Sequence, residues 1–152
     1  MTGWTPVTVA TVSAAMPTDF EDAYQAWLVA NPTKATRLAS IVSMVVRMFR
    51  TAVKAQVGYD PDTDTTTVPD AALLHAQNLV LFELGMEMGV AMEPQVYNLY
   101  TQANIWLRMA ARGTLLVDVG DAGVGTPSYQ TADCRRQTTS QIGATQNGRR
   151  RT

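Results

Sequence analysis

The sequence predicts an all-α fold, a bundle of about four helices with an extended N-terminal arm and a long extended C-terminal tail. Apolar residues recur at helical spacing in four segments between residues 18 and 113. Proline and glycine stand where those segments begin and end. After Gly120 the chain is rich in Gly, Thr, Gln and Arg and has no helical period. We therefore divide the chain into an arm (1–17), a helical body (18–113) and a tail (114–152).

The arm holds few charges and many Thr, Val and Ala residues, so we expect it to be extended, with a short strand or turn around Val7–Val12. The first helix is expected over residues 19–30. Thr18 would cap its free amides while Glu21 reaches back to the cap, as in a capping box.

Asn31-Pro32 ends the first helix and opens the second, expected over 33–57, because proline is tolerated only in a first turn. This helix carries one apolar stripe at steps of three and four and ends at Gly58. The stripe contains Leu38, Ile41, Val42, Val45, Phe49, Ala52 and Val53. The wetter surface is expected to hold Arg37, Arg47, Arg50 and Lys54.

Residues 59–70 form a polar loop in which Asp60, Asp62 and Asp64 have the spacing that begins a calcium loop. The sixth position of that pattern is Thr65 instead of Gly, and the twelfth is Ala71 instead of Glu. The loop is therefore interpreted as a solvated segment that leads into the next helix.

The third helix is expected over residues 70–88, opened by Pro69 and Asp70, and it is apolar over most of its circumference. Such a helix lies either at the centre of a bundle or against a neighbouring subunit. Four helices are few to cover it, which favours subunit packing. The predicted subunit interface comprises Leu81, Phe82, Met86 and Met88, with Met44 and Met48 of the second helix.

The fourth helix is expected to start at Glu93-Pro94, to run through Ala111 and to end at Gly113. A short run of strand character follows over residues 114–119.

Catalytic and metal-binding motifs are missing from the sequence. Cys134 is the only cysteine and His75 the only histidine, and no nucleophile signature or phosphate loop accompanies them. Glu83 and Glu87 lie on the same predicted helix as His75, whereas carboxylate metal sites draw ligands from more than one helix. We therefore expect a protein that is not an enzyme and has no catalytic residues, metal or cofactor.

Charge is sparse and unevenly placed. Charged residues make up 16% of the chain, below the usual quarter or so. Residues 1–120 hold seven basic and eleven acidic residues, a net −4, and residues 121–152 hold five and two, a net +3. A surface poor in charge indicates either cover by partners or an exterior of Thr, Gln and Ser. No apolar stretch approaches the roughly 20 residues of a membrane span, and no signal-peptide pattern is present, so we expect synthesis in a cytoplasm and no membrane partner.

The tail predicts a partner-binding segment. Its apolar residues are too few to offset the entropy of ordering the backbone, so we expect it to order only against a partner. An extended chain can add to a sheet edge while its arginines meet acidic groups or DNA phosphates. The predicted contacts are Leu115, Leu116, Val117, Tyr129, Arg135, Arg136, Ile142, Arg149, Arg150 and Arg151.

The same arginines permit a second function, a small helical DNA-binding or packaging accessory protein that neutralises phosphates without reading sequence. Five arginines with one tyrosine form a thin footprint for a dedicated binder.

Helices two to four resemble the small head–tail connector (adaptor or head-completion) proteins of tailed bacteriophages. In that family the last helix ends in a pattern like Y-x-x-A-x-x-W-L-x-x-x-A-x-G before a short apolar run. This sequence reads Tyr100-Thr-Gln-Ala103-Asn-Ile-Trp106-Leu107-Arg-Met-Ala110-Ala-Arg-Gly113, then Thr114-Leu115-Leu116-Val117. The likeness spans about residues 19–118. Many members have strongly charged helix surfaces, whereas the third helix here is apolar, which leaves open a tail-side completion protein or another ring component of the neck.

The resemblance implies a structural virion protein of the neck, assembled in the host cytoplasm. Its bodies would form a homo-oligomeric ring, a dodecamer, beneath the portal protein, and its extended termini would insert between neighbours or onto the portal. Tail or neck proteins would join the other side. DNA would pass through the lumen without specific binding, on its way into the capsid or out at ejection.

Overall fold

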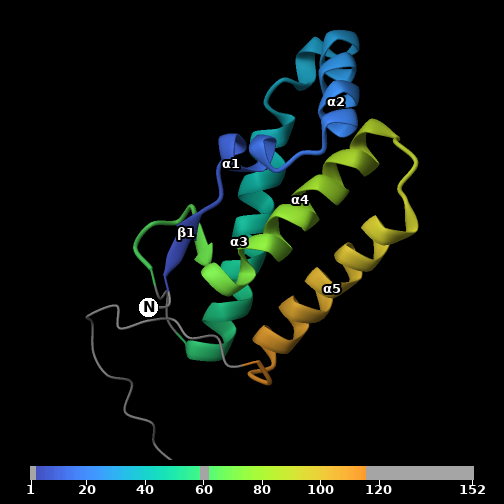
Figure 1. Ribbon diagram of the computed structural model, residues 1–152. Helices are drawn as coiled ribbons and strands as arrows, with labels where there is room; N and C mark the ends of the chain where they lie inside the picture. The colour runs from blue at the N-terminus through green and yellow to red at the C-terminus, as the bar shows by residue number, and fades with distance from the viewer. Residues whose placement is uncertain (1–2, 59–61, 116–152) are drawn as a thin grey trace, which may run out of the picture. The chain divides into compact units, whose positions relative to one another are not determined.

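The computed structural model describes residues 3–58 and 62–115. Helices dominate these residues (Figure 1), and the predicted all-α class is confirmed. The helices are α1 (Val9–Ala14), α2 (Thr18–Ala30), α3 (Arg37–Val57), α4 (Leu73–Met88) and α5 (Pro94–Ala111). Short 3-10 turns cover Pro32–Lys34 and Asp70–Ala72, and strands β1 (Trp4–Pro6) and β2 (Thr67–Pro69) pair with each other.

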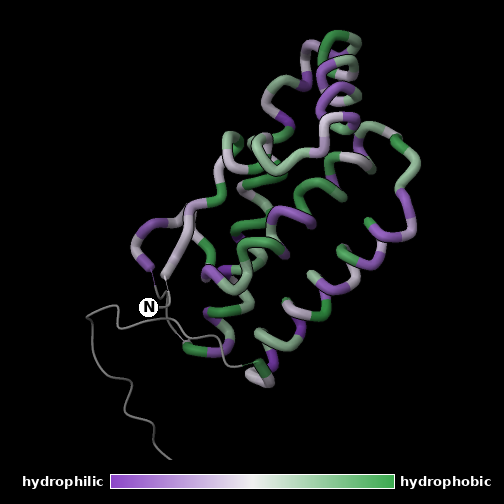
Figure 2. Tube along the Cα trace, in the orientation of Figure 1, coloured by the Kyte–Doolittle hydropathy of each residue, from purple (hydrophilic) through white to green (hydrophobic). Residues whose placement is uncertain are grey.

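The core lies where α3, α4 and α5 pack on one another (Figure 1). Hydrophobic residues gather along α3, α4 and α5, with hydrophilic residues between them, as Figure 2 shows by colour. Every residue of the stripe predicted for the second helix is buried, and Phe49 is fully so. The predicted break at Asn31-Pro32 is present, although α3 begins at Arg37 because a 3-10 turn intervenes.

Glycines end the helices where the sequence places them. Gly58 after α3 and Gly113 after α5 have φ of 80° and 68°. This left-handed conformation is unfavourable for any residue that has a Cβ atom. Gly89 ends α4 in the same way, with φ of 71°. The three long helices are therefore delimited by local chain chemistry.

The centre of the bundle is occupied by α4, which packs against α3, α5 and α1. Its side chains Leu79, Val80 and Leu84 are buried, so three neighbouring helices of the same chain cover most of this helix. The sequence favoured subunit packing for this helix because four helices are few to cover it, and the N-terminal segment adds α1 to that cover.

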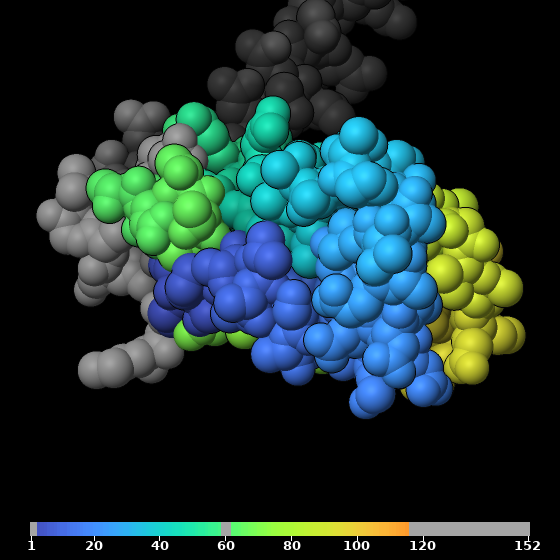
Figure 3. Space-filling view, turned by 90° about the horizontal axis from the view of Figure 1, so that it is seen from above, coloured from blue at the N-terminus to red at the C-terminus, as the bar shows by residue number. Residues whose placement is uncertain are grey.

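The N-terminal segment is not the extended arm predicted for residues 1–17. Strand β1 pairs antiparallel with β2, with Thr5 opposite Val68, and α1 follows. Asp70 holds the segment further, because its carboxylate accepts from the Gly3 amide at 3.0 Å and from the Thr5 hydroxyl. Val7, Val12 and Met16 are buried in the core. In Figure 3 this segment, in dark blue, lies between residues near β2, in green, and α2, in lighter blue.

The predicted capping box at Thr18 and Glu21 is also absent. Helix α2 begins at Thr18, its N-cap is Pro17, and no side chain caps it. The capping box of this region lies instead at Thr8 and Thr11, at the start of α1. No helix in the described part of the chain is both long enough and apolar enough to cross a membrane.

Candidate interaction site

Three of the six predicted interface residues pack against other side chains of the same chain. The ring of Phe82 stacks on that of Tyr100, with centroids 4.0 Å apart, and meets Tyr97 edge-on at 5.5 Å. Phe82 is therefore buried within one chain, where Tyr97 and Tyr100 of α5 cover it. Leu81 and Met88 are half-buried and pack against the same core.

The other three predicted interface residues are exposed. Met86 has 55% of its surface accessible, and Met44 and Met48 have 39% and 41%. Met109 on α5 is also exposed, so methionines recur on the surfaces of three helices. Methionine side chains are flexible and polarisable, which suits them to surfaces that adapt to a partner.

Of the predicted partner contacts in the tail, Leu115 alone lies among the described residues. It is half-buried against the body core, and the amides of Thr114 and Leu115 both donate to the Met109 carbonyl at the end of α5. The remaining contacts, from Leu116 to Arg151, lie outside the described residues.

His75 and Glu87 of α4 interact with side chains of the same chain. The His75 ring lies 6.2 Å from the Trp106 ring, and burial lowers the pKa of this imidazole. Glu87 accepts from Lys34 Nζ at 3.1 Å and from Arg37 Nη2 at 3.2 Å, and these hydrogen bonds hold the pKa of its carboxyl below the ordinary value. Within residues 3–58 and 62–115, no three His, Cys, Asp or Glu side chains gather as a metal ion would require.

Because the Glu87 pKa is lowered by folding, its contribution to stability is present above the ordinary glutamate pKa and is lost as the pH falls through the folded value. We expect Glu87→Gln to lower the urea midpoint at pH 7 and to have a progressively smaller effect as the pH falls below the ordinary glutamate pKa. Glu83→Gln removes the same charge one turn away on α4 and is the control. An equal difference between wild type and Glu87→Gln at every pH would show that the carboxylate's charge plays no part.

The loop before β2 uses its acidic residues to hold its own backbone. Asp62 Oδ1 accepts from the Asp64 amide at 3.2 Å, and Asp64 Oδ1 accepts from the Thr66 amide at 2.8 Å. The hydrogen bonds from Thr66 lower the pKa of the Asp64 carboxyl. These carboxylates build turns of the kind that aspartate favours in loops.

Arg50 fastens this loop to α3. Its guanidinium donates to the carbonyls of Asp62 and Asp64 at 2.7 and 2.6 Å and to the Thr67 carbonyl at 3.3 Å. The same group lies 5.6 Å from the Trp4 ring, within cation–π range. Arg50 is only 7% exposed, so its assignment to the wetter surface of the helix was wrong.

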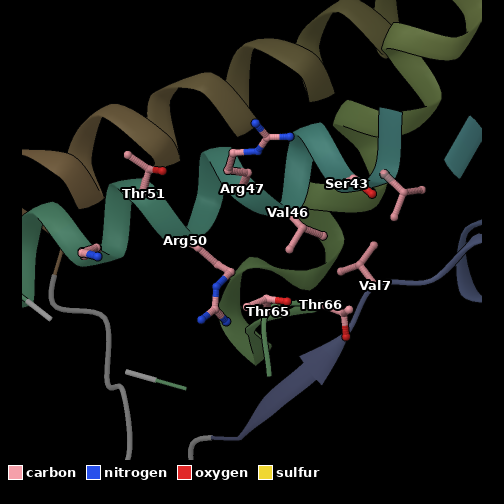
Figure 4. A pocket seen from close by; sticks show the side chains of 10 residues that line it. Val7, Ser43, Val46, Arg47, Arg50, Thr51, Thr65 and Thr66 are labelled. Atoms are coloured by element: carbon pink, nitrogen blue, oxygen red, sulfur yellow. The ribbon is translucent and has the colours of Figure 1, made fainter. Parts of the chain in front are cut away.

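A cleft of about 450 Å3 opens beside Arg50, between α3 and the loop before β2 (Figure 4). In this view Val46 and Arg50 point from α3 toward the loop, and Val7 and Thr66 face them. Hydroxyl groups and the exposed side chains of Arg47, Thr51 and Lys54 complete the lining. The residues are Val7, Val42, Ser43, Val46, Arg47, Arg50, Thr51, Lys54, Thr65 and Thr66.

The cleft combines an apolar floor with positive charge. Three of its ten lining residues are basic and none is acidic, although residues 1–120 carry a net charge of −4. An anionic group set beside apolar side chains fits such a lining. Sequence reasoning missed this cleft, although the basic residues recur along α3 at helical spacing, because Val7 and the threonines come from distant segments.

Comparison of the chain with models of known protein families, with curated proteins and with solved structures gives no match.

Proposed function

We propose that this chain is a ring-forming head–tail connector of a tailed bacteriophage, a structural subunit that docks onto the portal and joins the capsid to the tail. The observation that carries the proposal is the segment from Tyr100 to Gly113, in which the resemblance to that family resides. Ala103, Trp106, Leu107 and Ala110 are buried in the core, and Gly113 turns the chain out of α5 in a left-handed conformation.

The surface of the body supports a role in assembly. Exposed large apolar side chains occur on each of the five helices, among them Leu74 at 64% and Met86 at 55%. Scattered exposed apolar residues are ordinary on a monomer, but here they accompany a chain with few charges. Association removes such side chains from water without the cost of desolvating ions.

The charge of residues 1–120, the body with its flanking segments, supports a role around DNA. Residues 1–120 have a net charge of −4, so a ring wall built from them repels phosphates on average and does not hold a passing duplex. In this role the chain binds and orients partners and carries out no chemistry. The predicted partners are further copies of itself, the portal protein, and tail or neck proteins.

A DNA-binding accessory function is the second candidate, favoured by the five arginines against two aspartates in residues 121–152. Salt separates the two. When a protein binds DNA by neutralising phosphates, the logarithm of its affinity falls linearly with the logarithm of the salt concentration. The strength of apolar contacts between subunits changes little with salt.

The test is sedimentation of the full-length chain alone and with the portal protein of the same phage. We expect closed oligomers that co-sediment with the portal at 0.15 M and at 0.5 M salt. Met86→Asp should weaken assembly by about tenfold or more, because it buries a charge in an apolar contact. Thr101→Asp, at an exposed polar position, should not.

A folded monomer at every concentration, with the portal present, would overturn the ring. Binding to duplex DNA with a steep salt slope in that same sample would favour the accessory function.

A further inference from the structure

We infer that the cleft beside α3 is the receptor for the exposed face of α2 on a second copy of this chain. The inference rests on the proposed ring and specifies one of its contacts. Asp19 and Asp22 near the start of α2 would lie over the basic side chains of α3. Val29, near the end of α2, would meet the valine end of the cleft.

The exposed face of α2 has the required composition. Asp19, Asp22, Ala26 and Val29 recur at steps of three and four, so they share one side of the helix, and all four are exposed. Val29 is 84% exposed, the highest value among the large apolar side chains of the described residues. The opposite side of α2 faces the core through Tyr24 and its neighbours.

The position of α2 on its own chain leaves this face uncovered. Its inner residue Phe20 packs so closely on α4 that a Cβ built at Gly85 would lie 3.3 Å from the Phe20 ring. The cleft runs along the middle and later turns of α3, whereas α2 lies near the start of that helix (Figure 1). A chain whose α2 is fastened in this way does not place it in its own cleft, so an α2 face that enters the cleft would come from a second copy.

The two surfaces also match in length and charge. Asp22 and Val29 are seven residues apart and Val46 and Lys54 are eight, spans of about 10 to 12 Å along a helix. If α2 lies antiparallel to α3, its aspartates come over the basic end of the cleft. Val29 then lies toward Val42 and Val46, which form the floor at the other end. An acidic helix with an apolar end uses both halves of the lining, whereas a phosphate chain uses only the basic half.

A contact between two different surfaces of the same chain is heterologous, and repetition of it produces a ring when the rotation closes. Each subunit offers one cleft and one α2 face. The contact therefore gives the proposed ring a direction around its circumference. A symmetric pairing of identical surfaces would give it none.

The test is a charge exchange in the full chain, read by sedimentation with the portal present. Arg47→Glu and Asp22→Lys should each weaken assembly about tenfold, because each places like charges in contact. The double variant carries both changes and should assemble to within about threefold of wild type. Arg108→Glu, an exposed arginine on α5, is the control and should leave assembly unchanged.

A second measurement uses cross-linking. In a Cys134→Ser chain, Asp22→Cys combined with Thr51→Cys should give a ladder of covalent oligomers on oxidation, and either substitution alone should give dimers at most.

Failure of wild type to assemble with the portal would overturn the proposed function. If wild type assembles and the two single variants assemble equally well, or the double variant is not restored, the ring stands and this contact is wrong. Loss of DNA binding in Arg47→Glu with assembly unchanged would likewise overturn it and make the cleft a phosphate site.

Discussion

Phe49→Ala is expected to lower the free energy of unfolding by about 4 kcal/mol, because it leaves a cavity at the centre of the bundle. The Phe49 side chain is fully buried, and its ring lies 5.2 Å from that of Trp106. A domain of this kind is stable by about 5–15 kcal/mol, so the loss is a large part of the total.

The measurement is urea unfolding, monitored by circular dichroism and, as a second probe, by tryptophan fluorescence. Ile105→Ala is the control, since Ile105 lies on α5 beside Trp106 in sequence but is 49% exposed. Its effect should stay within about 0.5 kcal/mol. Equal effects of the two substitutions would contradict the described core.

Arg50→Met is expected to cost about 3 kcal/mol, because it leaves carbonyls of the loop before β2 without their donor. Methionine fills a similar volume but cannot donate to the carbonyls of Asp62, Asp64 and Thr67. Arg50→Lys keeps the charge but lacks the planar fork, so it should recover only part of the loss.

Arg47→Met is the matched control, one turn earlier on α3 and exposed, and it should change the free energy of unfolding by less than about 0.5 kcal/mol. Hydrogen exchange adds a local readout, since Arg50→Met should speed exchange of the Thr66 and Val68 amides more than that of amides in α5. Similar losses for the two arginine variants would mean that Arg50 does not fasten the loop.

The long helices could be predicted from sequence because their signals are local. The stripe of α3 repeats at the helical period, and Gly58 and Gly113 follow the last periodic residue of their helices. Strand β1 could not be found in this way, because it is three residues long and pairs with a partner more than 60 residues away in sequence. Propensity carries no record of such a pairing.

The surface was harder to predict than the core. Periodicity separates the faces of a helix, so it identified Met44 and Met48 as lying off the stripe, and both are exposed. Periodicity does not indicate which segment covers a given face. Phe82 is covered by α5 of the same chain, and Arg50 by a loop that folds back onto α3. The cleft joins residues from three separate segments, and only the folded chain brings them together.

The ring is tested most directly by electron microscopy of the full-length chain mixed with the portal protein of the same phage. A ring-forming connector predicts particles in which an extra annular layer is stacked coaxially on the portal, with an open channel through both. Portal particles that stay bare at saturating concentrations of folded chain would contradict the proposal.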